Sequence, residues 1–285
     1  MNLKILAIDT SSKVCSVAIT EDTNKIIELE NDDEKTHSVK LMPMVDEAFN
    51  KSGLSLNDID LLACSVGPGS FTGLRIGIAT IKAFSDAKNL PVTSISSLEG
   101  LAYNLIDDKT PTTKLANTLF VSLIDAKNEN VYCGLYRYYN NQLNQTTDLI
   151  AEDIHAVISK INTTLLSFSN QFNEVVFVGD GAVQYKEIIE NELDYSSIRF
   201  AEGTLNNSNS ISIATAGLIK YKNGDFGYSN YLVPLYLRKP QAERELENKQ
   251  ENTQEQEKKT IGQKVDKVGE EAVRNFGGKA LTAAT

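Results

Sequence analysis

Apolar positions in the first hundred residues form short runs, separated by longer stretches in which apolar residues have helical spacing. The runs predict β-strands at residues 3–10, 14–20, 25–30, 59–66 and 91–95. The helical spacing predicts helices at residues 37–51, from the segment 67–73 to about 89, and at 96–105. Gly53 closes the first of these helices, and a Ser-Ser-Leu-Glu capping box opens the last.

The same succession restarts after a polar stretch at residues 107–116. Strands are predicted at 118–126, 130–138 and 174–179, and helices at 152–163, after Gly181 and at 210–222. Two strand-rich units, each finished by helices, predict an internally duplicated α/β fold, although the sequence itself shows no repeat. We divide the chain into subdomains at 1–106 and 107–209, an extended segment at 223–240 and a charged tail, disordered or helical, at 241–285.

Composition narrows the functional classes. The chain has 28 Lys and Arg against 38 Asp and Glu, so its net charge of -10 disfavours a principal role in binding nucleic acid. Its 3 cysteines lack CxxC spacing, which indicates neither a disulfide framework nor a zinc site. No apolar stretch approaches the roughly 20 residues of a membrane span, and no signal peptide is recognisable. These features predict a cytoplasmic protein without a membrane partner.

The glycine-rich segment 67–73 (GPGSFTG) lies between a predicted strand and a predicted helix. Backbone amides in such a turn can bind phosphates or another backbone. The segment matches neither the dinucleotide-binding fingerprint nor the Walker A loop nor a nucleophile elbow, so a tight helix-capping turn is the alternative. Asp9 ends the first strand, where a carboxylate could hold magnesium and phosphate or simply form a turn. The candidate nest for nucleotide or backbone comprises Asp9, Gly67, Gly69, Ser70, Thr72 and Gly73.

Five short motifs resemble the bacterial TsaB (YeaZ) family. They are the N-terminal ILAIDTS at 5–11, GPGSFTGLRIG at 67–77, SLEG at 97–100, IDA at 124–126 with GDGA at 179–182, and PLYLRKP at 234–240. The resemblance extends over about residues 1–245 and leaves the tail without a match. It implies a two-subdomain fold of the actin, sugar-kinase and Hsp70 type, in which helix 210–222 packs back on the first subdomain.

The resemblance also implies a function. Proteins of this family support a TsaD-like enzyme in forming threonylcarbamoyladenosine beside the anticodon of tRNAs, together with a TsaE-like ATPase. For this chain we therefore expect a heterodimer with the TsaD-like subunit, a homodimer when it is alone, and contact with tRNA only through the complex. The resemblance implies no catalytic residue and no cofactor of its own, with ATP and magnesium acting at the level of the complex.

The catalytic paralogue carries a His-Met-Glu-Gly-His segment for its metal, and the matching positions here are Ser97 to Leu101. Both histidine ligands are replaced, by Ser97 and Leu101, and leucine cannot ligate a metal. We therefore expect no metal site. The alternatives are an ATP-dependent kinase or ATPase of the same fold and, less favoured because of the missing ligands, a metallopeptidase.

Two predicted helices have apolar arcs wider than the roughly 100° that one-sided packing on a sheet requires. The arc of helix 37–51 spans about 160°, and apolar residues surround most of the helix that follows the glycine segment. We therefore predict that these helices lie side by side and bind the partner. The candidate interface residues are Leu41, Met44, Val45, Ala48, Leu74, Ile78, Ile81 and Phe84.

The first testable prediction concerns the tail. Residues 243–260 contain one large apolar residue, Leu246, so they have almost nothing to bury. A chain that ends at Gln241 should therefore melt at nearly the same temperature as the full chain in scanning calorimetry. A drop of more than about 5 °C would mean that the tail is docked on the folded part.

Overall fold

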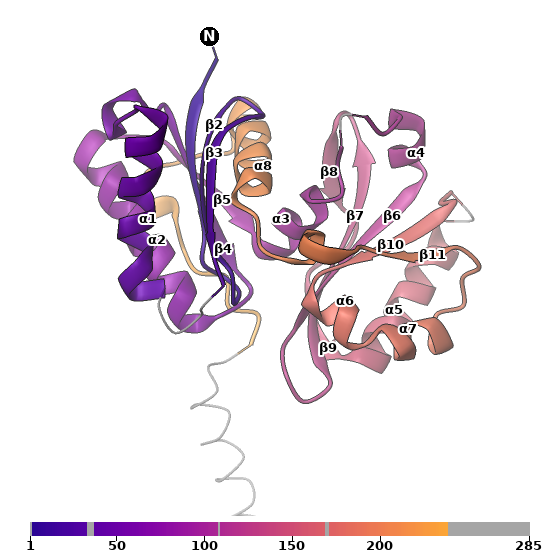
Figure 1. Ribbon diagram of the computed structural model, residues 1–285. Coiled ribbons are helices and arrows are strands. Elements are labelled where there is room, and N and C mark those ends of the chain that lie inside the picture. Colours follow the sequence, from indigo (N-terminus) through magenta and orange to yellow (C-terminus); the bar gives the residue numbers. More distant parts are fainter. Residues whose placement is uncertain (1, 33–36, 108, 169–170, 239–285) are drawn as a thin grey trace, which may run out of the picture. The chain divides into compact units, whose positions relative to one another are not determined.

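The computed structural model describes residues 2–32, 37–107, 109–168 and 171–238 (Figure 1). The predicted tail at 241–285 lies outside the described residues. Two β-sheets organise the described chain, one built mainly from the first hundred residues and the other from residues 118–200.

The first sheet has the strand order β3-β2-β1-β4-β5. Its strands are β1 (Lys4–Asp9), β2 (Cys15–Glu21), β3 (Asn24–Asn31), β4 (Leu61–Gly67) and β5 (Val92–Ser96). Strand β1 is antiparallel to β2 and parallel to β4, which is parallel to β5. Strands β1 and β4 are nearly continuous apolar runs because helices cover both faces of the sheet.

Helices α1 (His37–Ser52) and α2 (Phe71–Lys88) cover one face of this sheet, and α8 (Ser210–Lys222) covers the other (Figure 1). The short η2 (Leu56–Asp58) leads into β4, and α3 (Ser97–Tyr103) follows β5. Helix α8 is tied to β2 at its first residue, because the Ser210 amide donates to Ser16 Oγ at 3.0 Å and Ser210 Oγ donates to the Ser16 carbonyl at 2.6 Å.

The second sheet has the order β11-β10-β6-β7-β8, and β9 also pairs with β7. Its strands are β6 (Thr118–Asp125), β7 (Asn130–Tyr139), β8 (Gln142–Gln145), β9 (Ile150–Asp153), β10 (Glu174–Val178) and β11 (Ile198–Phe200). Helices α4 (Thr112–Ala116), α5 (Ile154–Ser167), α6 (Asp180–Gln184) and α7 (Lys186–Glu192) accompany it, with η3 (Gly203–Asn206) after β11 and η4 (Ser229–Tyr231) after α8.

The two sheets share one topology. In each sheet the central strand (β1 or β6) is antiparallel to the strand that follows it in the sequence (β2 or β7) and parallel to its other neighbour (β4 or β10). Asp9 and Asp125 end the two equivalent central strands, β1 and β6. This correspondence confirms the predicted duplicated α/β fold.

Most predicted elements match the structure within two or three residues, and α8 matches at both ends. Four elements, α4, β8, β9 and β11, were not predicted from the sequence. They have three to five residues each, which is too short for a periodic apolar signal.

The segment after α8 lies along the first sheet. Gly227 forms an antiparallel bridge with Val92, and the Leu235 amide donates to the Val66 carbonyl at 2.7 Å. Leu232 is fully buried and belongs to the same core as α1 and α2. The C-terminal segment therefore extends the core beside α2 before the tail begins.

Candidate functional site

Polar residues from four segments meet at the carboxyl edge of the first sheet. Asp9 ends β1, Ser65 lies near the end of β4, Ser97 begins α3, and Ser208 precedes α8. The hydroxyls of Ser65 and Ser97 are 2.8 Å apart, and Ser11 Oγ lies 3.4 Å from Ser208 Oγ. This edge is where α/β folds generally place their ligands, so it is the first candidate for a functional site.

Asp9 is the only acidic side chain among these groups, and it is 2% exposed. Its Oδ1 accepts a hydrogen bond from the Ser11 amide at 2.8 Å. Burial raises the pKa of the Asp9 carboxyl, while hydrogen bonds with Ser11, Ser65 and Ser208 act in the opposite direction. The carboxyl group is thus held by neutral donors beneath the surface.

The glycine segment packs directly on the turn that follows β1. The Ser70 amide donates to the Ser11 carbonyl at 2.7 Å, and Thr10 Oγ1 donates to the Gly73 carbonyl at 2.8 Å. A Cβ atom on Gly69 would lie 2.1 Å from the Ser11 carbonyl oxygen, and one on Gly73 would lie 2.0 Å from the Thr10 carbonyl oxygen. Glycine is required at both positions because two backbones are in contact there.

All six predicted nest residues therefore lie at this edge, but much of their bonding capacity is used within the chain. Ser70 caps α2 by accepting from the Gly73 amide at 3.3 Å. Gly67 and Gly73 are buried, Gly69 and Ser70 are half-buried, and Thr72 is exposed. Since Asp9 is closed off from solvent, this arrangement does not fit a magnesium–phosphate group at its carboxylate.

The positions that match the paralogue's metal ligands are occupied by core groups. Ser97 is 2% exposed and bonded to Ser65, and Leu101 is 6% exposed within an apolar cluster. Among the described residues, no group of three or more His, Cys, Asp and Glu side chains is arranged to hold a metal ion.

The structure corrects the predicted partner-facing residues. Seven of the eight lie within this chain's own core, where α1 and α2 pack on β1, β2 and β4, and Phe84 is half-buried. The seven buried residues are Leu41, Met44, Val45, Ala48, Leu74, Ile78 and Ile81. The wide apolar arcs are real, but the helical period alone does not tell which part of an arc faces the sheet.

Other apolar side chains of the same helices face outward. On α1, Val39 is 68% exposed and Met42 is 43% exposed. On α2, Ala79 and Ala83 are exposed. We call these four residues the outer face of α1 and α2. Met42, Ala79 and Ala83 lie in the arcs noted above, whereas Val39 lies outside the arc of its helix.

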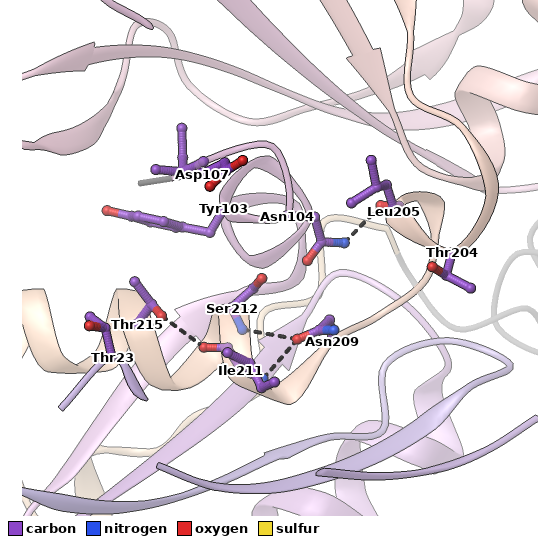
Figure 2. Close-up of a pocket in the computed structure, with 11 residues that line it drawn as sticks. Thr23, Tyr103, Asn104, Asp107, Thr204, Leu205, Asn209, Ile211, Ser212 and Thr215 are labelled. Carbon is purple, nitrogen blue, oxygen red and sulfur yellow. Dashed lines mark hydrogen bonds between the residues drawn. The ribbon is translucent and has the colours of Figure 1, made fainter. Parts of the chain in front are cut away.

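A polar pocket of about 380 Å³ lies between the end of α3, η3 and the first turns of α8 (Figure 2). Asn104 in its wall donates from Nδ2 to the Leu205 and Asn207 carbonyls, both at 2.8 Å. No Lys, Arg or His is among the described residues that line the pocket, so it does not suit phosphate. No motif drew attention to it, because its residues come from four separate segments.

The two sheets of equal topology and the loop that fills the edge of the first one define the class: a duplicated actin-like α/β protein. YeaZ from Pseudomonas aeruginosa has the same fold, with a TM-score of 0.67 and 22% identity over 82% of this chain and 100% of that chain.

Sequence comparison identifies the family. The model of tRNA N6-adenosine threonylcarbamoyltransferase (TsaD) matches residues 31–246. The chain is 30% identical to the tRNA threonylcarbamoyladenosine biosynthesis protein TsaB of Bacillus subtilis, over 85% of this chain and 96% of that protein. It is 34% identical to the TsaB protein of Haemophilus influenzae, over 69% of this chain and 80% of that protein. The chain belongs to the TsaB (YeaZ) family.

The contact between the glycine segment and the turn after β1 can be tested by adding one methyl group. Gly73→Ala should lower the free energy of unfolding by about 3 kcal/mol or more, because its Cβ would overlap the Thr10 carbonyl. Gly53→Ala is the matched control: its Cβ meets nothing within 4 Å and its φ is +70°, so about 1 kcal/mol of backbone strain is expected. Equal losses in urea unfolding would mean that the two backbones can separate.

The burial of Asp9 can be tested by removing its charge. Because its folded-state pKa is raised, the ionised carboxylate destabilises the fold above that pKa, and the effect disappears below the unfolded pKa of about 3.9. Asp9→Asn should therefore raise the melting temperature at pH 8, and the gain should be lost as the pH falls from the folded-state pKa to about 4. A gain that stayed constant with pH, or a loss at pH 8, would contradict the assigned cause.

Proposed function

We propose that this chain is a non-catalytic subunit of the machinery that forms threonylcarbamoyladenosine beside the anticodon of tRNAs. Its relatives are named for the biosynthesis of that nucleoside, and the matching family model is that of the transferase. The chain binds and supports a TsaD-like enzyme that transfers the threonylcarbamoyl group.

The observation that supports a non-catalytic role is that the chain's own side chains fill the carboxyl edge of the first sheet. Ser97 and Leu101 stand where the paralogue's metal ligands are expected, and both side chains are buried in this chain. Asp9 is enclosed by serine hydroxyls and backbone. An ATPase or kinase of this fold would need an open carboxylate for magnesium, and a metallopeptidase would need its ligands, so both alternatives are disfavoured.

The outer face of α1 and α2 is the proposed contact with the TsaD-like subunit. Val39 and Met42 expose apolar surface on α1, and Ala79 and Ala83 do so on α2, which contacts α1. Small side chains on α2 allow another helix to approach closely, and exposed apolar patches commonly mark protein interfaces. In the absence of that subunit, the same face would pair with a second copy of this chain.

The charge of the chain bears on how it would meet tRNA and the other components of the complex. A net charge of -10 disfavours direct binding to tRNA, so tRNA is reached through the complex, in which a TsaE-like ATPase supplies the step that uses ATP and magnesium. No helix in the described ranges is long and apolar enough to cross a membrane. We place the complex in the cytoplasm, where its tRNA substrate is found.

The proposal is tested by co-purification with the TsaD-like protein of the same cell. Met42→Asp and Ala79→Asp should each abolish recovery of the complex, because a carboxylate would be buried in an apolar contact without a partner. Leu166→Asp is the matched control: Leu166 is 80% exposed on α5 in the second sheet region, and its variant should co-purify normally.

Two results would overturn the proposal. The first is failure of the unmodified chain to bind the TsaD-like protein. The second is threonylcarbamoyl transfer to tRNA by the isolated chain. Folding of each variant is checked by its melting temperature, so that lost binding is not confused with unfolding.

A further inference from the structure

Beside the outer face of α2 lies an aromatic and cationic cluster formed by Phe71, Arg75 and Tyr236. The rings of Phe71 and Tyr236 stack with centroids 4.7 Å apart and planes at 27°. The Arg75 guanidinium carbon lies 3.9 Å from the Phe71 centroid, and Arg75 Nε donates to the Tyr236 hydroxyl at 3.1 Å. We call these three residues the Arg75 stack.

The stack is held from two sides. Phe71 is the first residue of α2, just after Ser70, which caps that helix. Tyr236 follows Leu235, whose amide is bonded to β4 and whose side chain packs on the core. Tyr236 is 40% exposed and Val233 is 64% exposed, so the segment turns its leucines inward and these two side chains outward. Arg75 is therefore oriented in advance, at a surface position.

The charge of Arg75 is uncompensated within the described part of the chain. Neither Arg75 nor Lys82, two turns further along α2, takes part in any ion pair there, and Asp86 is not within ion-pair distance of Lys82. Arg75 uses Nε for Tyr236, which leaves its two terminal amino groups to donate outward. Within the described ranges, Arg75 and Lys82 therefore place two cations without an ion pair on one side of α2.

We propose that the Arg75 stack is the docking point for a carboxylate side chain of the TsaD-like subunit. This inference rests on the proposed function and adds a specific polar contact to the apolar face, since Arg75 lies one turn before Ala79. A planar guanidinium forms paired hydrogen bonds with a carboxylate, and tyrosine and arginine are common energetic centres of interfaces. RNA is the less favoured occupant, because two cations on an acidic protein attract phosphates weakly.

Affinity measurements with the purified TsaD-like protein give the first test. Arg75→Gln should weaken binding about tenfold or more, and Arg75→Lys should lose most of the same affinity, because lysine keeps the charge without the paired donors. Lys114→Gln is the matched control: it removes one exposed charge from α4 and should bind like the unmodified chain. Each variant is also titrated with tRNA alone.

Cross-linking identifies the occupant. Carbodiimide joins a lysine amine to a carboxylate that touches it, so the Arg75→Lys complex, prepared at a concentration above its dissociation constant, should form an amide between position 75 and an Asp or Glu of the TsaD-like subunit. Mass spectrometry of the digested complex locates that bond. The unmodified chain should give no bond at position 75.

The possible results separate this inference from the proposed function. If Met42→Asp abolishes binding while both Arg75 variants bind normally, the stack is not the docking point and the proposed function stands. A cross-link to this chain's own residues 241–285, to a second copy, or a loss confined to tRNA binding also overturns the inference. If the unmodified chain does not bind the TsaD-like protein, the proposed function itself fails.

Discussion

The structure depends on one contact between two stretches of backbone. The glycine segment lies so close to the turn after β1 that carbonyl oxygens of Thr10 and Ser11 occupy the space where Cβ atoms would be. This contact fixes where α2 begins, and through α2 it fixes the position of the aliphatic core on β1 and β4. It also covers Asp9, because Ser11 is held between the carboxylate below it and the Ser70 amide above. The core and the enclosed site are therefore consequences of the same close approach.

An ionised carboxylate that is enclosed among hydroxyls lowers the stability of the fold, because neutral donors only partly replace the hydration that it loses. The fold nevertheless retains it at the carboxyl edge of the first sheet. Serines at positions 11, 65, 97 and 208 satisfy one another and the carboxylate instead of an external group. A site that is closed by its own side chains agrees with the proposed non-catalytic role.

The sequence was sufficient to predict the duplicated fold, because long apolar runs and strong caps determine β1, β4, α1, α2 and α8 independently of the rest of the molecule. It was insufficient for β8, β9 and β11, whose short segments become strands only by pairing with β7 or β10. For the site, the motif at 67–73 identified the correct loop, but burial of Asp9 depends on Ser208, almost 200 residues away. The residues predicted to face a partner lie mostly in the core instead, because the angular period that reveals a wide apolar arc carries no information on which side the sheet lies.

Helix α2 links these features, since its sides serve different purposes. Its inner side packs on the sheet through Leu74, Ile78 and Ile81. Its outer side carries the small apolar side chains of Ala79 and Ala83. Phe71 and Arg75 join its first turns to Tyr236. Because the glycine contact sets the start of this helix, a shift of the loop would displace all of these surfaces together. The proposed contact with a TsaD-like subunit on this helix would therefore depend on the geometry of the glycine segment.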